Sequence, residues 1–339
     1  MINRVYRLVD TKRIEPVMRE IRDDEGDVLV RPEHMSICAA DRRYYFGRRK
    51  QEILKKKLPM ALIHEATGTV LHDRAGRYAP GAKVVLVPLV EKEKMPFVKG
   101  NYNPANPFLS SGHDGFMRDA VAAPHERLVP IGESASVAYV FTEIVSVALN
   151  AIGAFERARA TEASVLGVWG DGGMGYVTAL TLKCLYPEAK IFVFGKTARK
   201  LQKFSFADGT FFIDDIPRDT KIDHGFECAG GAGSEAAIAQ IAERVAPQGL
   251  ILLFGVSEDP VAIPTRTVLE KGLTLIGNSR SDADDFASAA RLIRENAVCG
   301  KYLRMLISET IEVKTEDDIA YAFEQDALND FKTVIKWAI

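Results

Sequence analysis

Cysteine is scarce in this chain of 339 residues. The four cysteines, at positions 38, 184, 228 and 299, are scattered and form neither a C-x-x-C pair nor a regular framework. This spacing excludes the disulfide scaffold that holds many small secreted domains together. Free thiols are typical of a reducing compartment, so the sequence predicts a cytoplasmic location.

Long apolar runs and an excess of one charge are also missing. No apolar run approaches the roughly 18–20 residues of a membrane span, and the opening MINR lacks a signal-peptide core. The 44 basic and 46 acidic side chains give a formal net charge of −2, which indicates neither a nucleic acid nor a membrane as partner. With 47% hydrophobic residues, the chain is long enough for two globular domains.

The most informative stretch of the sequence is 164–200. A short apolar run at 165–169 leads into a glycine-rich turn, a helical run follows at 174–185, and a second apolar run occupies 191–194. Strand, turn, helix and strand within about thirty residues predict a βαβ unit.

The turn of this unit has the G-x-G-x-x-G pattern, with Gly170, Gly172 and Gly175 in the three glycine positions. The first glycine allows the tight turn, the second allows backbone to approach a pyrophosphate, and the third allows the helix to pack on the strand. Because the pattern lies between a strand and a helix, it predicts a dinucleotide site with phosphates at the helix N-terminus.

The end of the second strand indicates which dinucleotide binds. NAD-binding units usually place a carboxylate there, whereas this chain has Lys196, Thr197, Arg199 and Lys200. Cations and a hydroxyl suit a 2′-phosphate, so the sequence predicts NADP(H) rather than NAD(H). The alternative is a solvated helix start without a ligand.

Strand-like runs continue through the C-terminal half and alternate with helical or turn segments. This alternation predicts a doubly wound parallel sheet with helices on both faces, and ligands at the carboxyl ends of the strands. Cys228 ends one such run, and no base is adjacent to it, so we interpret it as a packed residue rather than a nucleophile. The runs are 211–213, 222–228, 250–255 and 273–277.

The first 150 residues are β-rich, because short apolar runs are divided by proline and glycine without helical periodicity. Between these runs lie Cys38, the pair His64 and Glu65, and later Glu143. Thiolate, imidazole and carboxylate are the ligands of a catalytic Zn²⁺, which keeps one position open. Taken alone, these residue types leave open a buried structural cysteine and an ordinary loop histidine.

In combination, the motifs resemble the zinc-dependent medium-chain dehydrogenase/reductase family over essentially the whole chain. Within that family the chain looks like the ribulose-5-phosphate reductases of the ribitol-phosphate pathway. The family motifs are CAAD at 38–41, HEATGTV at 64–70, PGAKV at 80–84 and the glycine turn. The narrower likeness lies in MSICAADRRYY at 35–45, LIHE at 62–65, SSGHDGFM at 110–117, WGDG at 169–172, VFGKT at 193–197, FEC at 226–228 and LEKGLTLIG at 269–277.

This resemblance implies an α/β fold in two domains. A GroES-like, β-rich catalytic domain is expected at 1–148 and 282–339. A Rossmann domain that binds NADP, with a doubly wound parallel sheet, is expected at 149–281. Lys332 would approach the cofactor pyrophosphate, as the corresponding basic residue does in relatives.

The resemblance also implies roles for residues in the first domain. Cys38, His64 and Glu143 would be zinc ligands. Glu65 would be a ligand that exchanges with water, or a residue that supports the ligands. Tyr44 matches a tyrosine of the substrate pocket in polyol dehydrogenases.

Two departures from the family pattern affect the chemistry. Many relatives have Ser or Thr two residues after the ligand cysteine to pass the alcohol proton outward, but this chain has Ala40. The proton would move through zinc-bound water, Glu65 or Tyr44 instead. Residues 88–112, where many relatives bind a structural zinc, contain no cysteine, so one zinc per chain is predicted.

A phosphorylated substrate needs cations near the metal. The segment DRRYYFGRRK at 41–50 carries five basic residues directly after Cys38. Arg43 and Arg49 are the predicted phosphate ligands, with Arg280 as a further candidate. A solvated charged loop is the alternative for each of them.

The implied reaction is reduction of D-ribulose 5-phosphate to D-ribitol 5-phosphate by NADPH, supplying CDP-ribitol for wall teichoic acid or capsule. A homodimer is implied, and a cytidylyltransferase is a possible partner. One alternative is a zinc-dependent NAD(P) polyol or alcohol dehydrogenase with an unphosphorylated substrate. Another is a non-catalytic scaffold that binds NADPH, which the complete ligand set disfavours.

Overall fold

The computed structural model describes residues 2–132 and 136–339. The chain divides into two compact units, one formed by Met1–Ser146 with Ser281–Ile339 and the other by Val147–Arg280. The first unit is therefore assembled from both ends of the chain, and the second is a continuous insertion.

The second unit is built on one parallel sheet. Its strands are β9 (Val165–Trp169), β10 (Lys190–Gly195), β11 (Gly209–Phe212), β12 (His224–Glu227), β13 (Leu250–Leu253) and β14 (Thr274–Gly277). The order β11-β10-β9-β12-β13-β14 places the first strand in the middle, and every neighbouring pair is parallel. The winding reverses between β9 and β12, as in dinucleotide-binding folds. The predicted doubly wound sheet is confirmed.

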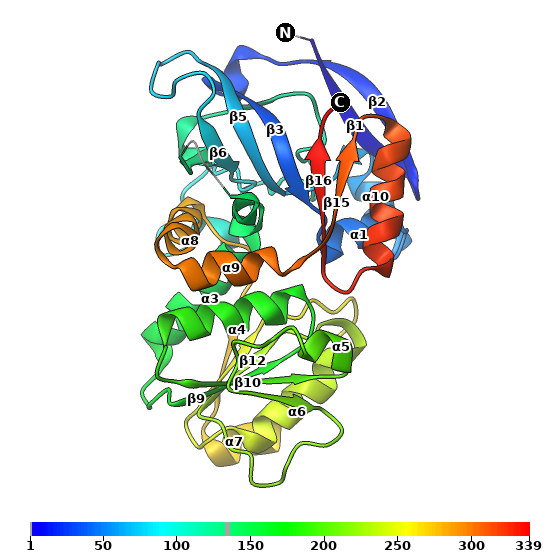
Figure 1. The fold of residues 1–339 in the computed structure, drawn as a ribbon. Coiled ribbons are helices and arrows are strands. Elements are labelled where there is room, and N and C mark those ends of the chain that lie inside the picture. The colour runs from blue at the N-terminus through cyan, green and yellow to red at the C-terminus, as the bar shows by residue number, and fades with distance from the viewer. Residues whose placement is uncertain (1, 133–135) are drawn as a thin grey trace. The chain divides into compact units, whose positions relative to one another are not determined.

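Helices cover both faces of this sheet because its central strands are apolar on both sides. Every residue of β12, for example, is buried. Figure 1 shows α4 on one side of the sheet and α6 on the other. The helices are α3 (Thr142–Ala158, which starts in the first unit), α4 (Gly173–Leu185), α5 (Ala198–Leu201), α6 (Ser234–Arg244) and α7 (Thr265–Lys271), with the 3-10 turn η5 (Gly231–Gly233).

The first unit is β-rich, as its sequence predicts. Its strands are β1 (Ile2–Asp10), β2 (Arg13–Glu20), β3 (Val28–Ser36), β4 (Met60–Ala61), β5 (Glu65–Asp73), β6 (Lys83–Leu86), β7 (Val121–Ala123), β8 (Leu128–Pro130), β15 (Ile307–Val313) and β16 (Lys332–Trp337). One sheet has the order β15-β16-β3-β5-β6-β8, with β7 also paired to β3, and a smaller sheet has the order β2-β1-β4. The last strand of the chain thus pairs with β3, which leads to Cys38.

Helices of the first unit close a core of apolar strand residues. Buried side chains from both ends of the chain, such as Tyr6 and Trp337, share this core, and their rings meet edge to face at 5.3 Å. The helices are α1 (Ala39–Tyr45), α2 (Gln51–Lys57), α8 (Ala283–Glu295), α9 (Ala297–Arg304) and α10 (Glu316–Leu328), with 3-10 turns η1 (Asp23–Glu25), η2 (Gly100–Tyr102), η3 (His125–Arg127) and η4 (Val137–Phe141).

One helical stretch is apolar on average, although it is not an uninterrupted apolar run. Val137–Ala158 spans 22 residues with a mean hydropathy of 1.6, enough by length and composition alone to cross a membrane. However, 72% of its apolar window is buried inside the folded chain. The apolar character is therefore that of a largely buried helix.

Candidate functional site

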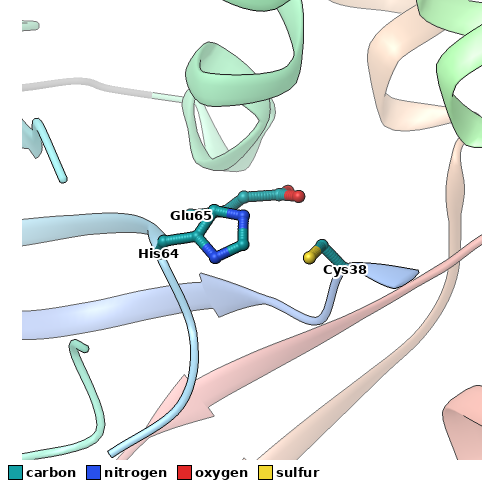
Figure 2. A group of neighbouring side chains, drawn as sticks. All are labelled: Cys38, His64 and Glu65. Atoms are coloured by element: carbon teal, nitrogen blue, oxygen red, sulfur yellow. The ribbon is translucent and has the colours of Figure 1, made fainter. Parts of the chain in front are cut away.

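Cys38, His64 and Glu65 come together in the first unit. One ligand atom from each lies within 4.8 Å of those of the other two. Figure 2 shows the sulfur of Cys38 facing the imidazole of His64, with the carboxylate of Glu65 beside them. The imidazole and carboxylate are almost fully buried, with His64 8% and Glu65 1% exposed.

Antiparallel pairing of β3 with β5 brings these residues together. The register places Ser36, at the end of β3, opposite Glu65, at the start of β5. Cys38 follows Ser36 by two residues and caps the N-terminus of α1. Cys38 and His64, which are 26 positions apart in the sequence, thus meet because β3 ends beside the start of β5.

Asp41 holds both ligand segments in place. Its carboxylate accepts hydrogen bonds from the Cys38 N–H (3.1 Å), the Ile63 N–H (3.0 Å) and the Ser110 hydroxyl (2.7 Å). Asp41 is fully buried, and its Oδ1 lies 3.8 Å from Nδ1 of His64. The sequence contained this residue only as the last position of CAAD, and its orienting role emerges from the tertiary contacts.

The three residues fit a zinc ion. The buried Nδ1 of His64 and Oε2 of Glu65 have no hydrogen-bond partner among the described residues. Burial raises the pKa of the Cys38 thiol, and Asp41 adds to that rise. Burial opposes protonation of His64, but Cys38 and Asp41 raise its pKa well above its usual value. A bound cation would satisfy the orphaned atoms and displace these protons, as zinc does with Cys and His ligands.

Glu143 lies in the first turn of α3 and is 7% exposed. Burial, with a contribution from Glu65, raises its pKa to about 7, although His64 acts in the opposite direction. Within the described ranges, the close group of ligand atoms contains Cys38, His64 and Glu65 but not Glu143. The role of Glu143 as a zinc ligand therefore stays a prediction.

Lys332 forms a buried ion pair with Glu65 that the sequence did not predict. At the start of β16, its ammonium donates to Oε1 of Glu65 at 2.6 Å and to the Ile37 carbonyl at 3.1 Å. The side chain is buried, 6% exposed. Because Lys332 binds Oε1 of Glu65, the other carboxylate oxygen, Oε2, remains available to the group of Cys38 and His64. The predicted contact of Lys332 with the cofactor pyrophosphate stays a prediction.

Replacing Lys332 with Met should destabilise the protein, because it leaves the Glu65 carboxylate buried without its charge partner. We expect the free energy of unfolding to fall by about 3 kcal/mol. Lys336→Met is the matched control on the same strand, since Lys336 is 56% exposed in its pair with Glu312. It should change stability by less than about 0.5 kcal/mol. Urea unfolding measures both, and equal effects would contradict the importance of the buried pair.

The predicted substrate residues fall into both units. Tyr44 is 2% exposed in the first unit, and the Arg49 guanidinium carbon lies 4.9 Å from the centre of its ring. Arg43 is half-buried in α1. Arg280 is the last residue of the second unit, with φ of 61° and its carbonyl bonded to Asn150. Their contacts with a substrate stay predictions.

A cavity of about 350 Å³ lies at the carboxyl ends of the strands in the second unit. Of the predicted cofactor residues, Gly170, Gly172, Lys196 and Lys200 line it, and Gly175 and Thr197 do not. The missing side chain of Gly175 has a packing reason, because a Cβ there would lie 1.9 Å from the Gly170 carbonyl oxygen. The cavity has the position and the cations that a dinucleotide phosphate requires.

Cys228 also lines this cavity, as a packed residue. Burial raises the pKa of its thiol, which donates to the Thr178 hydroxyl at 3.6 Å. A protonated, buried thiol is a poor nucleophile, which agrees with the interpretation from sequence.

The structure places a carboxylate at the end of β10, where the sequence offered none. Oδ2 of Asp171, from the glycine turn, accepts the backbone N–H groups of Lys196 (2.8 Å) and Thr197 (2.7 Å). These bonds fix the turn that carries Lys196 and Lys200. Because they occupy both N–H groups, side-chain ammonium groups are left to bind an anion there.

Known proteins resemble this chain along its whole length. The alcohol dehydrogenase GroES-like domain family matches residues 24–133. The chain is 48% identical to ribulose-5-phosphate reductase 2 of Staphylococcus aureus and 45% identical to the ribulose-5-phosphate reductase of Bacillus spizizenii, covering 100% of each chain in both comparisons. The crystal structure of S. aureus TarJ in complex with NADPH aligns over 100% of both chains, with 44% identity and a TM-score of 0.88.

Proposed function

The chain belongs to the ribulose-5-phosphate reductase family of zinc-type medium-chain dehydrogenases, and we propose that it reduces D-ribulose 5-phosphate to D-ribitol 5-phosphate with NADPH. The observation that carries the proposal is the buried group of Cys38, His64 and Glu65 in a chain 48% identical to such a reductase along its whole length. An oxidoreductase of this type needs a metal group, a dinucleotide site and a place for the sugar phosphate.

Cys38, His64 and Glu65 would hold one catalytic zinc ion, with Glu143 as a further candidate ligand. A bound zinc ion supplies Lewis-acid polarisation of the substrate carbonyl. Asp41 keeps the cysteine and histidine segments oriented through its bonds to both. Ala40 provides no hydroxyl, so we assign the movement of the alcohol proton to Glu65 or Tyr44.

Gly170, Gly172, Lys196 and Lys200 would hold NADP(H) in the cavity of the second unit. The bound nicotinamide supplies the hydride for the reduction. The glycines would let backbone approach the pyrophosphate, and the two ammonium groups would bind the 2′-phosphate of the adenosine half.

Two glycine substitutions should separate packing from cofactor approach. Gly175→Ala forces a Cβ against the Gly170 carbonyl, so we expect the unfolding free energy to fall by about 2 kcal/mol. At Gly172 a Cβ would meet nothing within 4 Å, so Gly172→Ala should keep its stability and weaken NADPH binding about tenfold. Thermal unfolding and fluorescence titration with NADPH measure the two effects. Unchanged NADPH affinity in Gly172→Ala would contradict the assigned pyrophosphate site.

The function is tested by following NADPH oxidation with D-ribulose 5-phosphate, beside D-ribulose and NADH as controls, before and after chelation. We expect turnover that requires the phosphate and is lost with the metal. Equal turnover of D-ribulose would favour the polyol dehydrogenase alternative, and no turnover by zinc-loaded protein would overturn the proposal.

The cellular setting is proposed on the family alone. The product would supply CDP-ribitol for wall teichoic acid or capsule in the cytoplasm, with a cytidylyltransferase as the next enzyme. A homodimer is also proposed, on the family alone. Light scattering of the purified protein tests the dimer.

A further inference from the structure

Lys57, at the end of α2, is connected through a loop to the residue that orients the metal-ligand group, a connection that sequence patterns did not show. Its ammonium donates to the Ser111 hydroxyl at 2.7 Å. The neighbouring Ser110 hydroxyl donates to Asp41, which orients Cys38 and His64. Ser111, which accepts from Lys57, is therefore the next residue in sequence after Ser110, which donates to Asp41.

A second contact ties the same loop to the metal group. The ring of Phe108 lies 5.4 Å from the imidazole of His64, edge to face. Three residues of one loop thus make successive contacts: Phe108 with His64, Ser110 with Asp41 and Ser111 with Lys57. The loop fixes the position of the ammonium relative to the metal ligands.

Lys57 and Arg49 share one aromatic ring. The Arg49 guanidinium carbon lies 4.9 Å, and the Lys57 ammonium 5.9 Å, from the centre of the Tyr44 ring. Both cations therefore contact the same buried ring. The hydrogen-bond partner of Lys57 is a neutral hydroxyl, and no carboxylate among the described residues forms a salt bridge with it. A bound anion would give the Lys57 ammonium a charged partner.

The backbone separation of Cys38 and Tyr44 is of the same order as the length of a five-carbon sugar phosphate. Tyr44 follows Cys38 by six residues along α1, a rise of about 9 Å at ~1.5 Å per residue. In ribulose 5-phosphate, bonds of ~1.5 Å separate the ketone carbon from phosphorus by roughly 6 Å in an extended chain. The proposal therefore places the carbonyl of the substrate at the group of Cys38, His64 and Glu65 and its phosphate beside the Tyr44 ring.

We propose that Lys57, Arg49 and Ser111 form the subsite for the phosphate of the substrate, around the ring of Tyr44. The inference rests on the proposed function and deepens it, since it names the groups that select a phosphomonoester over a free sugar. Lys57 and Arg49 supply charge-assisted donors to the dianion. The Ser111 hydroxyl accepts from Lys57 and donates its own proton to a phosphate oxygen.

The test compares Lys57→Met with Lys56→Met, its exposed neighbour on α2. For zinc-loaded Lys57→Met, we expect KM for D-ribulose 5-phosphate to rise about 30-fold with kcat within about twofold of wild type. The kcat/KM for D-ribulose should stay within about twofold, and Lys57→Arg should recover most of the lost affinity. Lys56→Met should match wild type with both substrates.

Equal losses on both substrates, or no change on either, would overturn the subsite. Ser111→Ala is the second variant, and its KM for the phosphorylated substrate should rise about fivefold. If wild type turns over neither substrate, the proposed function fails, and binding of inorganic phosphate by phosphorus NMR then judges the subsite separately. Binding that is lost in Lys57→Met and kept in Lys56→Met supports it, and equal binding in both overturns it.

Discussion

Replacing Cys38 with Ser is expected to remove the zinc and to lower kcat for D-ribulose 5-phosphate by about a thousandfold. A serine hydroxyl stays protonated at neutral pH, whereas a thiolate is a strong zinc ligand. Loss of the metal removes the polarisation of the carbonyl, worth several kcal/mol, while the glycine-turn cavity lies in the other unit and should remain. Elemental analysis and steady-state kinetics measure the two losses, and titration with NADPH checks the cavity.

Cys184→Ser is the matched control. Cys184 lies on α4 in the second unit and is half-buried, so this variant should keep both zinc and activity. If Cys38→Ser retained one zinc ion and wild-type turnover, the group of Cys38, His64 and Glu65 would not be the catalytic metal site.

The second large effect concerns the choice of cofactor. Replacing both Lys196 and Lys200 with Ala should lower kcat/KM for NADPH about a hundredfold and leave kcat/KM for NADH within about twofold. Both lysines line the cavity, and Asp171 already binds the backbone N–H groups of Lys196 and Thr197. The ammonium groups, rather than these backbone N–H groups, are therefore expected to bind the 2′-phosphate of NADPH. NADH has no 2′-phosphate, so its binding should not depend on the two lysines.

Arg199→Ala is the control for this cofactor prediction. Arg199 lies between the two lysines in the sequence but is exposed and does not line the cavity. We expect its kinetics with both cofactors to match wild type. An equal loss in Arg199→Ala would mean that overall positive charge, rather than a built phosphate site, favours NADPH.

The sequence predicted well the elements that local patterns encode. The glycine turn between two apolar runs appears as β9, the N-terminus of α4 and β10. A strand, a helix start and a tight turn are each specified by residues within a few positions of one another, so periodicity and glycine placement suffice. The proposed metal ligands were predicted through resemblance to a family, because the residue types alone leave a buried cysteine and a loop histidine open.

Partners that come from distant segments could not be read from local patterns. Lys332 is 267 positions from Glu65, and they meet only because β16 pairs with β3 beside β5. Asp171 reaches the end of β10 because β9 and β10 are neighbours in the sheet. The periodicity of residue types within a segment does not show which strand ends lie together in the sheet.

By itself, the sequence determined the order of the motifs and the alternating pattern of the second unit. Only the tertiary structure decided that Lys332 balances Glu65, that Asp171 fixes the turn carrying the lysines, and that Lys57 joins Arg49 at Tyr44. The physical reason is that propensity and periodicity act over a few residues, whereas charge pairing in a buried site depends on strand register and packing across the whole chain.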